Sequence, residues 1–400
     1  MFKNFFTIAW RNLGRNKAFA FINILGLSSG IGCAILIYTL VTFQYSFDGF
    51  HFDGNRIYRI VTEFHNETIE YQPGVPQPLG RAFRNDFSFL EKSASVKIYR
   101  NALISVPGGN ESKKFMEEDG VAYAEPEYFD IFNFPLDKGN SYTDLKEPNS
   151  ALITGNLATK YFGAENPIGR IIRYDNKTDF RVVGILKNIP GNTDRRQEVY
   201  LSYANLKDKD PWYASDSSWG SIASSMNFFV RLKPGVAPSR IENVFPAFVK
   251  KYFGGDDAKT ARLKLQPLSD IHFNADFDGS ANKKYLWALS LIGLLLLVTA
   301  CVNFINLATA QALNRAKEVG LRKVMGSLRS HLFWQFITET TLIVLFAFVL
   351  AFGMAQLALP PVNKLIGTQM TVGVLKDATG SLNDQKIILS PLNVFHKNDG

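Results

Sequence analysis

Cysteine and histidine are scarce in this chain of 400 residues. The two cysteines, Cys33 and Cys301, both lie in apolar stretches, so the long polar region between them can form no disulfide of its own. The five histidines are scattered, and neither His-Glu-x-x-His nor Gly-x-Ser-x-Gly occurs. The common patterns of metallopeptidases and serine hydrolases are therefore missing. We expect no enzyme activity, no catalytic residue, no metal and no cofactor.

A phosphate-binding loop is missing too, because Gly-x-x-x-x-Gly-Lys-[Ser/Thr] occurs nowhere in the chain. The chain is therefore not expected to hydrolyse ATP itself. Its formal charge of +8 is a modest excess that favours an anionic partner, either nucleic acid or a membrane surface. The long apolar stretches favour the membrane, so we expect a lipid bilayer and no nucleic acid.

Three apolar stretches are long enough to cross a hydrocarbon core of about 30 Å, which takes roughly 20 helical residues. We predict transmembrane helices at residues 21–43, 284–307 and 332–359, the last with its lead-in and with Pro360 and Pro361 at its end. A cleaved signal peptide is the alternative for the first stretch. The apolar run is too long for that, and no Ala-x-Ala site follows it.

Basic residues near the helix ends predict the direction of insertion. They precede the first helix at Lys3, Arg11, Arg15 and Lys17, and they recur between the second and third helices at Arg315, Lys317, Arg322, Lys323 and Arg329. Both clusters should be cytoplasmic, together with the N-terminus. The region 44–283 is then extracytoplasmic, and so is the tail 360–400, in which no fourth membrane helix is found.

Residues 1–20 are expected to form an amphipathic helix. One helical face carries apolar residues, mostly aromatic, at Phe2, Phe5, Phe6, Ala9, Trp10 and Leu13, while cationic residues fall on the other face. Such a helix lies in the cytoplasmic interface of a membrane. A soluble helix packed on a partner is the alternative.

The extracytoplasmic region has the pattern of an α+β domain made of two β-α-β units with a β-rich insertion. The first unit is predicted as strand 57–64, helix 77–86 and strand 94–99. The second is predicted as strand 226–232, a helix from an N-cap at Ser239 to Tyr252, and strand 262–268. The insertion contains predicted strands 150–154, 170–174 and 181–186.

Two clusters in this region are candidate sites. Asp48, His51 and Asp53 could hold a metal, but local bonding of these groups, with packing of Phe47, Phe50 and Phe52, is the favoured interpretation. A polar loop carries a second cluster: Trp212, Tyr213 and Trp219. They could touch a partner or ligand, and packing of the loop on the domain is equally compatible.

The segment 308–331 is predicted to be a cytoplasmic coupling loop. Arg315, Glu318 and Arg322 are spaced three and four apart, which places them on one helical face. Gly326 is a natural helix stop, and Ser327 can cap a following helix. A basic membrane anchor explains the charges but not the capped helix, so we favour docking on a partner through Arg315, Lys317, Glu318, Arg322 and Lys323. Glu339 should lie near the interface.

The first membrane helix contains Gly26-x-x-x-Gly30, a spacing that lets another helix approach closely. A seam to a second copy is one interpretation, and a chance occurrence of this frequent motif is the other.

Three separated segments of the chain resemble the MacB/FtsX-type permeases of the ABC superfamily, in particular the N-terminal half of the long forms of Bacteroidota. The first holds residues 9–13 (AWRNL), 16–17 (NK), 22–27 (INILGL), 47–51 (FDGFH) and 56–59 (RIYR). The second holds residues 151–154 (ALIT), 161–163 (YFG), 167–169 (PIG) and 180–186 (FRVVGIL). The third holds residues 301–307 (CVNFINL), 315–326 (RAKEVGLRKVMG) and 335–339 (QFITE).

This resemblance implies a permease of the bacterial inner membrane with a MacB-like periplasmic core at 44–283 and the start of an FtsX-like domain at 332–359. The coupling loop would sit on a separate ABC ATPase, whose closure moves the extracytoplasmic domain for export or extrusion. A second permease copy or half is implied, and a periplasmic or outer-membrane partner is left open. Family members have four membrane helices per unit, so a chain with three is expected to be a fragment or to have an atypical end.

Two other classes stay open at this point. One is a membrane-anchored extracytoplasmic sensor or binding protein, which would need an output domain that the sequence does not show. The other is an anchored extracytoplasmic enzyme, which would need a catalytic constellation. Co-purification with a nucleotide-binding subunit separates these classes from a permease.

Overall fold

The structure is a computed structural model that describes residues 2–15, 17–108, 112–314, 316, 320–321, 324–325, 329–368 and 370–372. The described chain divides into two compact units. The helical unit contains the chain up to Tyr45 and the chain from Lys283 onward, and the sheet unit contains Ser46–Asn282. Long apolar helices together with an α+β sheet domain confirm the predicted fold class.

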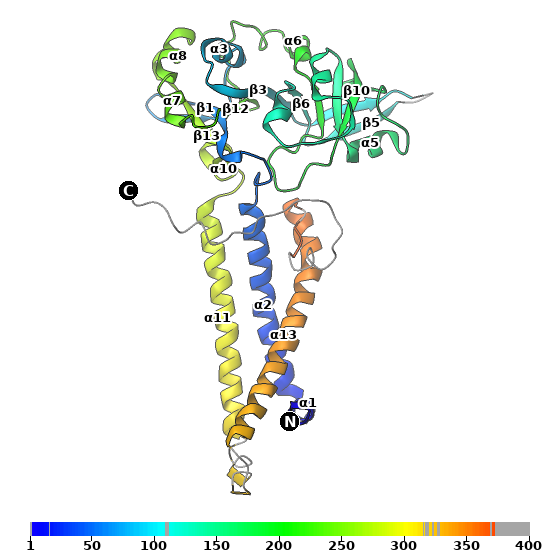
Figure 1. Ribbon diagram of the computed structural model, residues 1–400, viewed down its shortest axis with the longest axis vertical. Coiled ribbons are helices and arrows are strands. Elements are labelled where there is room, and N and C mark those ends of the chain that lie inside the picture. The colour runs from blue at the N-terminus through cyan, green and yellow to red at the C-terminus, as the bar shows by residue number, and fades with distance from the viewer. Residues whose placement is uncertain are drawn as a thin grey trace. The chain divides into compact units, whose positions relative to one another are not determined.

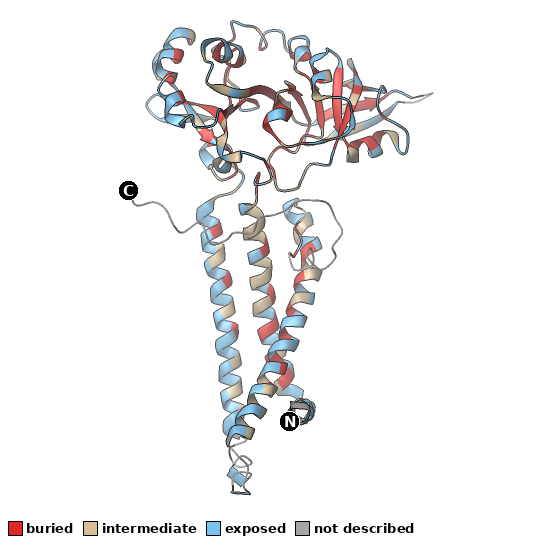
Figure 2. Cartoon of the chain, viewed as in Figure 1, coloured by how far each residue is buried: buried red, intermediate tan, exposed pale blue. Residues whose placement is uncertain are grey.

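The helical unit consists of α1 (Phe2–Arg15), α2 (Lys17–Tyr45), α11 (Lys283–Asn314) and α13 (Arg329–Ile366). The last three are the described helices that are long and apolar enough to span a membrane. Helix α2 lies between α11 and α13 and packs on both (Figure 1). Only 11% to 33% of their apolar windows is buried, so most of the apolar surface is available to lipid (Figure 2).

Helix α13 does not end at Pro360 and Pro361, as we predicted, but continues to Ile366. A proline inside a helix removes one hydrogen bond and crowds the carbonyl four residues earlier, which can kink a helix without ending it. The actual stop is Gly367, whose φ of 67° is the left-handed conformation that commonly terminates helices. The side chain of Asn363 holds the following turn by accepting from the backbone nitrogen of Met370 at 3.0 Å.

A single mixed sheet of thirteen described strands organises the sheet unit (Figure 1). The strands are β1 (Ile57–His65), β2 (Ile69–Gln72), β3 (Leu90–Tyr99), β4 (Ala102–Val106), β5 (Lys113–Glu117), β6 (Val121–Ala124), β7 (Leu136–Gly139), β8 (Ser150–Thr154), β9 (Ile171–Tyr174), β10 (Thr178–Leu186), β11 (Val199–Ser202), β12 (Met226–Leu232) and β13 (Ala261–Pro267). Their order is β13-β1-β12-β3-β6-β11-β8-β10-β9-β4-β5, with β2 beside β1 and β7 beside β10.

Helices and short helical turns connect these strands. They are η1 (Gly54–Arg56), α3 (Leu79–Asp86), α4 (Tyr128–Ile131), η2 (Tyr142–Lys146), α5 (Gly155–Phe162), η3 (Tyr203–Asn205), α6 (Leu206–Lys209), α7 (Pro238–Glu242), α8 (Phe245–Tyr252), α9 (Asp257–Thr260), α10 (Leu268–Ile271) and η4 (Ala275–Phe277).

The two predicted β-α-β units interleave in the sheet. The strands β1 and β3 of the first unit alternate with β12 and β13 of the second, all antiparallel. Helices α3, α7 and α8 enclose one core with these strands. The insertion, β4 to β11, continues the same sheet through the β3–β6 pair and contains two parallel pairs, β8–β10 and β6–β11. Its inner strands are buried by apolar clusters, whereas β5 and β7 are mostly exposed (Figure 2).

The helix predicted from Ser239 to Tyr252 is in fact two helices, α7 and α8, and α7 begins at Pro238 with Ala237 at the N-cap. Proline is favoured in the first turn of a helix, where no backbone donor is needed. Within a continuous helix, Pro246 could not donate to Glu242 and its ring would clash there. Breaking the helix places Pro246 in the first turn of α8 instead.

Candidate functional site

The residues predicted to dock on a partner, Arg315, Lys317, Glu318, Arg322 and Lys323, lie outside the described residues. Three large apolar residues between α11 and α13 are described, and the sequence motifs gave them no role. Leu321, Val324 and Met325 expose 65%, 89% and 77% of their surface. Their spacing of three and four residues, which could have revealed them, is that of one helical face. The loop therefore combines exposed apolar side chains with charges nearby in the sequence.

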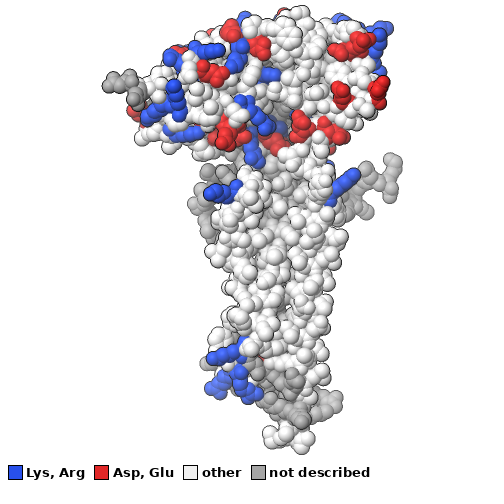
Figure 3. All heavy atoms as spheres, turned by 180° about the vertical axis from the view of Figure 1, so that it is seen from behind, with Lys and Arg blue, Asp and Glu red and all other residues white. Residues whose placement is uncertain are grey.

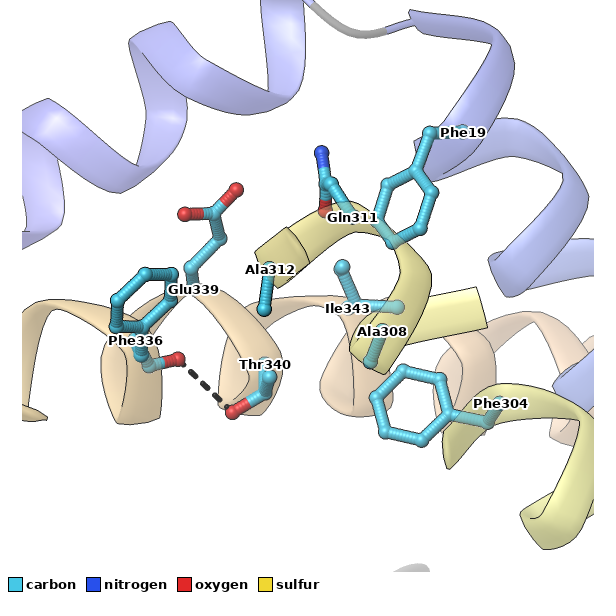
Figure 4. A pocket seen from close by; sticks show the side chains of 9 residues that line it. All are labelled: Phe19, Phe304, Ala308, Gln311, Ala312, Phe336, Glu339, Thr340 and Ile343. Carbon is cyan, nitrogen blue, oxygen red and sulfur yellow. Dashed lines mark hydrogen bonds between the residues drawn. The ribbon is translucent and has the colours of Figure 1, made fainter. Parts of the chain in front are cut away.

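The helices α2, α11 and α13 line a small cavity of about 30 Å³ (Figure 4). The lining residues are Phe19, Phe304, Ala308, Gln311, Ala312, Phe336, Glu339, Thr340 and Ile343. Glu339 is only 4% exposed and shares the cavity with Gln311. Phe19 lines the same cavity and lies two residues after Lys17, the first residue of α2. The carboxylate of Glu339 is therefore near the basic end of that helix. Placement of Glu339 close to an interface stays a prediction that this position supports.

Helix α1 packs along α13. Ala9 is fully buried, and the ring of Trp10 lies 5.8 Å from that of Phe346 while the indole remains 55% exposed. One face of α1 thus packs against α13 within the helical unit. On the face shown in Figure 3, a belt without Lys, Arg, Asp or Glu separates basic side chains at the two ends of this unit. That distribution is typical of a membrane-embedded bundle.

The two glycines of the Gly26-x-x-x-Gly30 motif have different surroundings. A Cβ atom at Gly30 would lie 2.4 Å from the Cβ of Ala300, so α2 and α11 approach each other closely at this point. A Cβ atom at Gly26 would meet no atom within 4 Å. Gly30 therefore serves packing inside this chain, whereas the side of Gly26 is open among the described residues. A role of Gly26 towards a second copy stays a proposal.

Replacing Gly30 by valine is expected to destabilise the α2–α11 contact by about 1 to 3 kcal/mol, the usual cost of forcing extra volume into a packed interface. Gly26→Val is the matched control, because the same side chain on the same helix meets open space. The measurement is the yield of a disulfide between cysteines placed on α2 and α11 in membranes. Equal cross-linking in the two variants would contradict the assignment of Gly30.

In the sheet unit, Asp48 and His51 are both buried, directly after α2. Asp48 accepts a hydrogen bond from Arg195 at 2.8 Å and another from the hydroxyl of Thr193 at 2.5 Å. Burial by itself would raise the pKa of Asp48, but the charge of Arg195, the neighbouring His51 and the hydrogen bond from Thr193 hold it below its usual value. Asp53 pairs instead with Arg56 at 2.6 Å.

This geometry agrees with the favoured interpretation of local bonding. Among the described residues no group of three His, Cys, Asp or Glu side chains could hold a metal. Phe47 is buried as expected, but Phe52, which we expected to pack, is 76% exposed. Its backbone nitrogen donates to Asn133 at 2.8 Å, so the turn is held through the backbone and the ring points outward.

His51 is held as a neutral imidazole. Its Nδ1 accepts from the backbone nitrogen of Asn133 at 3.0 Å, and its Nε2 faces Asp48 at 3.5 Å. A proton on Nδ1 would break the first contact. Burial, supported by the charge of Arg195, lowers the pKa of His51 although Asp48 opposes this effect.

Stability should therefore fall on acidification. A histidine whose pKa is lower in the folded state contributes fully above its unfolded pKa of about 6.5 and loses that contribution as the pH falls below it, by up to about 1.4 kcal/mol per pH unit. The free energy of unfolding, measured by urea titration between pH 7.5 and 5.5, should lose part of its pH dependence in His51→Gln. The surface variant His65→Gln is the control, and an unchanged slope in His51→Gln would contradict the prediction.

A second hydrogen-bonded cluster joins Asp194 and Ser280 to the buried side chain of His272. The Nδ1 atom of His272 lies 2.9 Å from Asp194 and 3.0 Å from the hydroxyl of Ser280. A catalytic triad needs the carboxylate and the nucleophile on opposite nitrogens of the imidazole. Here both partners meet the same nitrogen, so this cluster is a structural hydrogen-bond network.

The loop with Trp212, Tyr213 and Trp219 is partly packed on the domain. Trp219 stacks on Tyr252 with ring centroids 4.8 Å apart, and Tyr213 is buried. Trp212 alone of the three is mainly exposed, at 72%. A contact of this loop with a partner would therefore involve Trp212.

Three described helices long and apolar enough to span a membrane, with a large sheet domain inserted after the first of them, define a membrane protein with a domain outside the bilayer. The chain matches the MacB-like periplasmic core domain over residues 20–247 and the FtsX-like permease C-terminal domain over residues 290–393. It therefore belongs to the MacB/FtsX family of ABC exporter permeases, as the sequence motifs indicated.

Curated relatives include the macrolide export ATP-binding/permease protein MacB of Aggregatibacter actinomycetemcomitans, which is 25% identical over 55% of this chain and 32% of its own length. The pyoverdine export ATP-binding/permease protein PvdT of Pseudomonas syringae is 22% identical over 86% of this chain and 51% of its own length. The chain thus spans about a third to a half of the curated relatives it matches.

Solved structures that resemble the chain include a domain of a permease protein from Porphyromonas gingivalis, with a TM-score of 0.42 and 19% identity over 54% of this chain and 91% of that one. The periplasmic region of MacB from Actinobacillus actinomycetemcomitans has a TM-score of 0.38 and 15% identity over 55% of this chain and 91% of that one.

Proposed function

We propose that this chain is the permease subunit of a mechanotransmission-type ABC transporter. A separate cytoplasmic ATPase would hydrolyse ATP, and the helical unit would pass the resulting movement to the extracytoplasmic sheet unit for export or extrusion. The observation that carries this proposal is the presence of both permease domains of the family in a chain that has no phosphate-binding loop. Family membership implies an ABC ATPase partner.

The segment 308–331 is the proposed docking site for that ATPase. Its charges, Arg315, Lys317, Glu318, Arg322 and Lys323, accompany the exposed side chains of Leu321, Val324 and Met325. Exposed apolar residues with charges around them are typical of a protein interface. A membrane anchor would require the charges alone.

The proposed topology places the N-terminus and the loop 308–331 in the cytoplasm and the sheet unit outside the inner membrane. Covalent continuity supports a mechanical role, because α2 ends at Tyr45 and α11 starts at Lys283, the two boundaries of the sheet unit. The alternative function, a membrane-anchored extracytoplasmic sensor or binding protein, needs no ATPase. A second permease copy, or a further half in a longer chain, would complete the transporter.

Affinity purification of the full chain from native membranes tests this proposal. A nucleotide-binding subunit should co-purify, and its ATPase rate in nanodiscs should change when the permease is present. Labelling of a cysteine placed at Gly320 by an impermeant thiol reagent in intact cells should fail. Purification without any nucleotide-binding subunit, or labelling from outside, would favour the sensor or binding protein.

A further inference from the structure

Both ends of the sheet unit meet a single short loop. Ser46 directly follows helix α2, and Asn282 directly precedes helix α11. The segment Asn192–Arg195 lies between β10 and β11 of the insertion, far from both ends in the sequence. It nevertheless hydrogen-bonds to the residues that follow α2 and to residues that precede α11.

On the α2 side, Asn192 makes three contacts. Its side-chain nitrogen donates to the carbonyl of Ser46 at 2.8 Å and to the hydroxyl of Ser46 at 3.2 Å. Its carbonyl accepts from the backbone nitrogen of Asp48 at 2.9 Å. Thr193 and Arg195 then hold the carboxylate of Asp48. Four consecutive residues of one loop thus include three that bind the chain where it leaves α2.

On the α11 side, the remaining residue of the loop makes the contacts. Asp194 lies 2.9 Å from Nδ1 of His272 and accepts from the hydroxyl of Ser280 at 3.0 Å. The carbonyl of His272 accepts from the backbone nitrogen of Ala281, next to the start of α11, at 2.9 Å. The two sides also touch directly, because the rings of Phe47 and His272 stack with centroids 3.5 Å apart.

We propose that Asn192–Arg195 is a clasp that joins the two membrane connections, which are the segment that follows α2 and the segment that precedes α11. The two connections would then move together and pass one common movement to the insertion, β4 to β11. This inference rests on the proposed function for its purpose, the transfer of movement. Its physical basis on the α2 side is burial, because Thr193 is fully buried and Asp48 is 4% exposed, so water cannot readily replace the hydrogen bond between them. Hydrogen bonds are electrostatically stronger in such a low-dielectric environment, so the clasp holds Asp48 firmly on this side.

Each connection is also fixed separately, and this makes the clasp testable. The α2 side is held by Asn133 at the backbone of Phe52, and the α11 side is held by Arg59, whose Nη2 donates to the carbonyl of Phe277 at 3.0 Å. Loss of one clasp contact should therefore not unfold the domain. If the clasp couples the two connections, loosening one side must loosen the other as well.

Hydrogen–deuterium exchange of the full chain in nanodiscs tests the coupling. The variants are Asn192→Ala, which removes the side-chain hydrogen bonds to Ser46, and Asp194→Ala, which removes the hydrogen bonds to His272 and Ser280. Each should speed exchange by about fivefold or more in both segments 46–50 and 279–282, because local opening of a coupled network is shared. Asn188→Ala is the matched control, since Asn188 bonds to Asn156 at the start of α5 and to neither connection.

An increase confined to the segment beside each substitution, no increase, or an equal increase in the control would overturn the clasp. Exchange in β12 reports general unfolding. If Asp194→Ala raises exchange there, Asp194→Asn carries the test, because it retains an acceptor for Ser280. ATPase co-purification, measured on the same preparations, reports the proposed function separately: its absence from the parent chain would overturn that function and leave the exchange result standing.

Discussion

Replacing Arg195 by alanine should lower the free energy of unfolding of the sheet unit by about 3 to 5 kcal/mol, the usual cost of leaving one partner of a buried ion pair alone. Arg195 is 5% exposed and Asp48 is 4% exposed. The guanidinium also lies over the rings of Phe132 and Phe229, at 4.5 and 5.5 Å from their centroids. The substitution therefore removes a charge partner and a packed cation at once.

Urea unfolding of the full chain in detergent, followed by near-ultraviolet circular dichroism, measures this effect. The matched control is Arg170→Ala, which breaks an exposed pair with Glu165 and should change stability by less than about 1 kcal/mol. The double variant Asp48→Ala/Arg195→Ala should lose less than the sum of the single variants, because neither charge is then left unpaired. Additive losses would show that the two residues do not act as a pair.

Reversing single charges in the loop 308–331 should weaken binding of the ATPase and its coupling to the permease. Glu318→Arg and Arg322→Glu should each weaken co-purification by roughly tenfold or more, since a like charge is placed against the partner surface. The alternative is that the two residues only stabilise their own helix, an effect of about 0.3 to 0.5 kcal/mol for such a pair.

The double variant Glu318→Arg/Arg322→Glu separates these explanations. A swapped pair restores attraction within the helix but not towards a partner, so docking predicts that the defect persists, whereas a purely local role predicts recovery. Lys250→Glu, on an exposed position of α8, controls for a change in net charge. Binding and ATPase stimulation are measured for all four variants, and full activity of the single variants would refute docking through this loop.

Local sequence patterns predict the bounds of a strand correctly where burial is uniform along it. The strands Ser150–Thr154 and Met226–Leu232 have the bounds that we predicted, because nearly every residue in them faces a core and is apolar or small. The strand Lys113–Glu117 was missed, since it is a mostly exposed edge strand with charged residues. The short strand Val121–Ala124 was missed because four residues provide too little periodicity.

For the candidate sites too, the sequence indicated some of the residues and the structure revealed the others. The sequence directed attention to Asp48 and His51 but did not reveal Arg195, which lies 147 residues from Asp48. It also treated Gly26 and Gly30 as equivalent, whereas only Gly30 meets Ala300. Both distinctions depend on which parts of the chain come together, and spacing within a segment does not contain that information.

The sequence by itself determined the membrane helices, the α+β class of the inserted domain and the family, because hydrophobic length, strand periodicity and local motifs are properties of contiguous residues. Only the tertiary structure decided that the loop Asn192–Arg195 binds the chain beside both α2 and α11. Folding brings Ser46, Asp194 and His272 together through the pairing of distant strands, and the resulting hydrogen bonds depend on that three-dimensional arrangement.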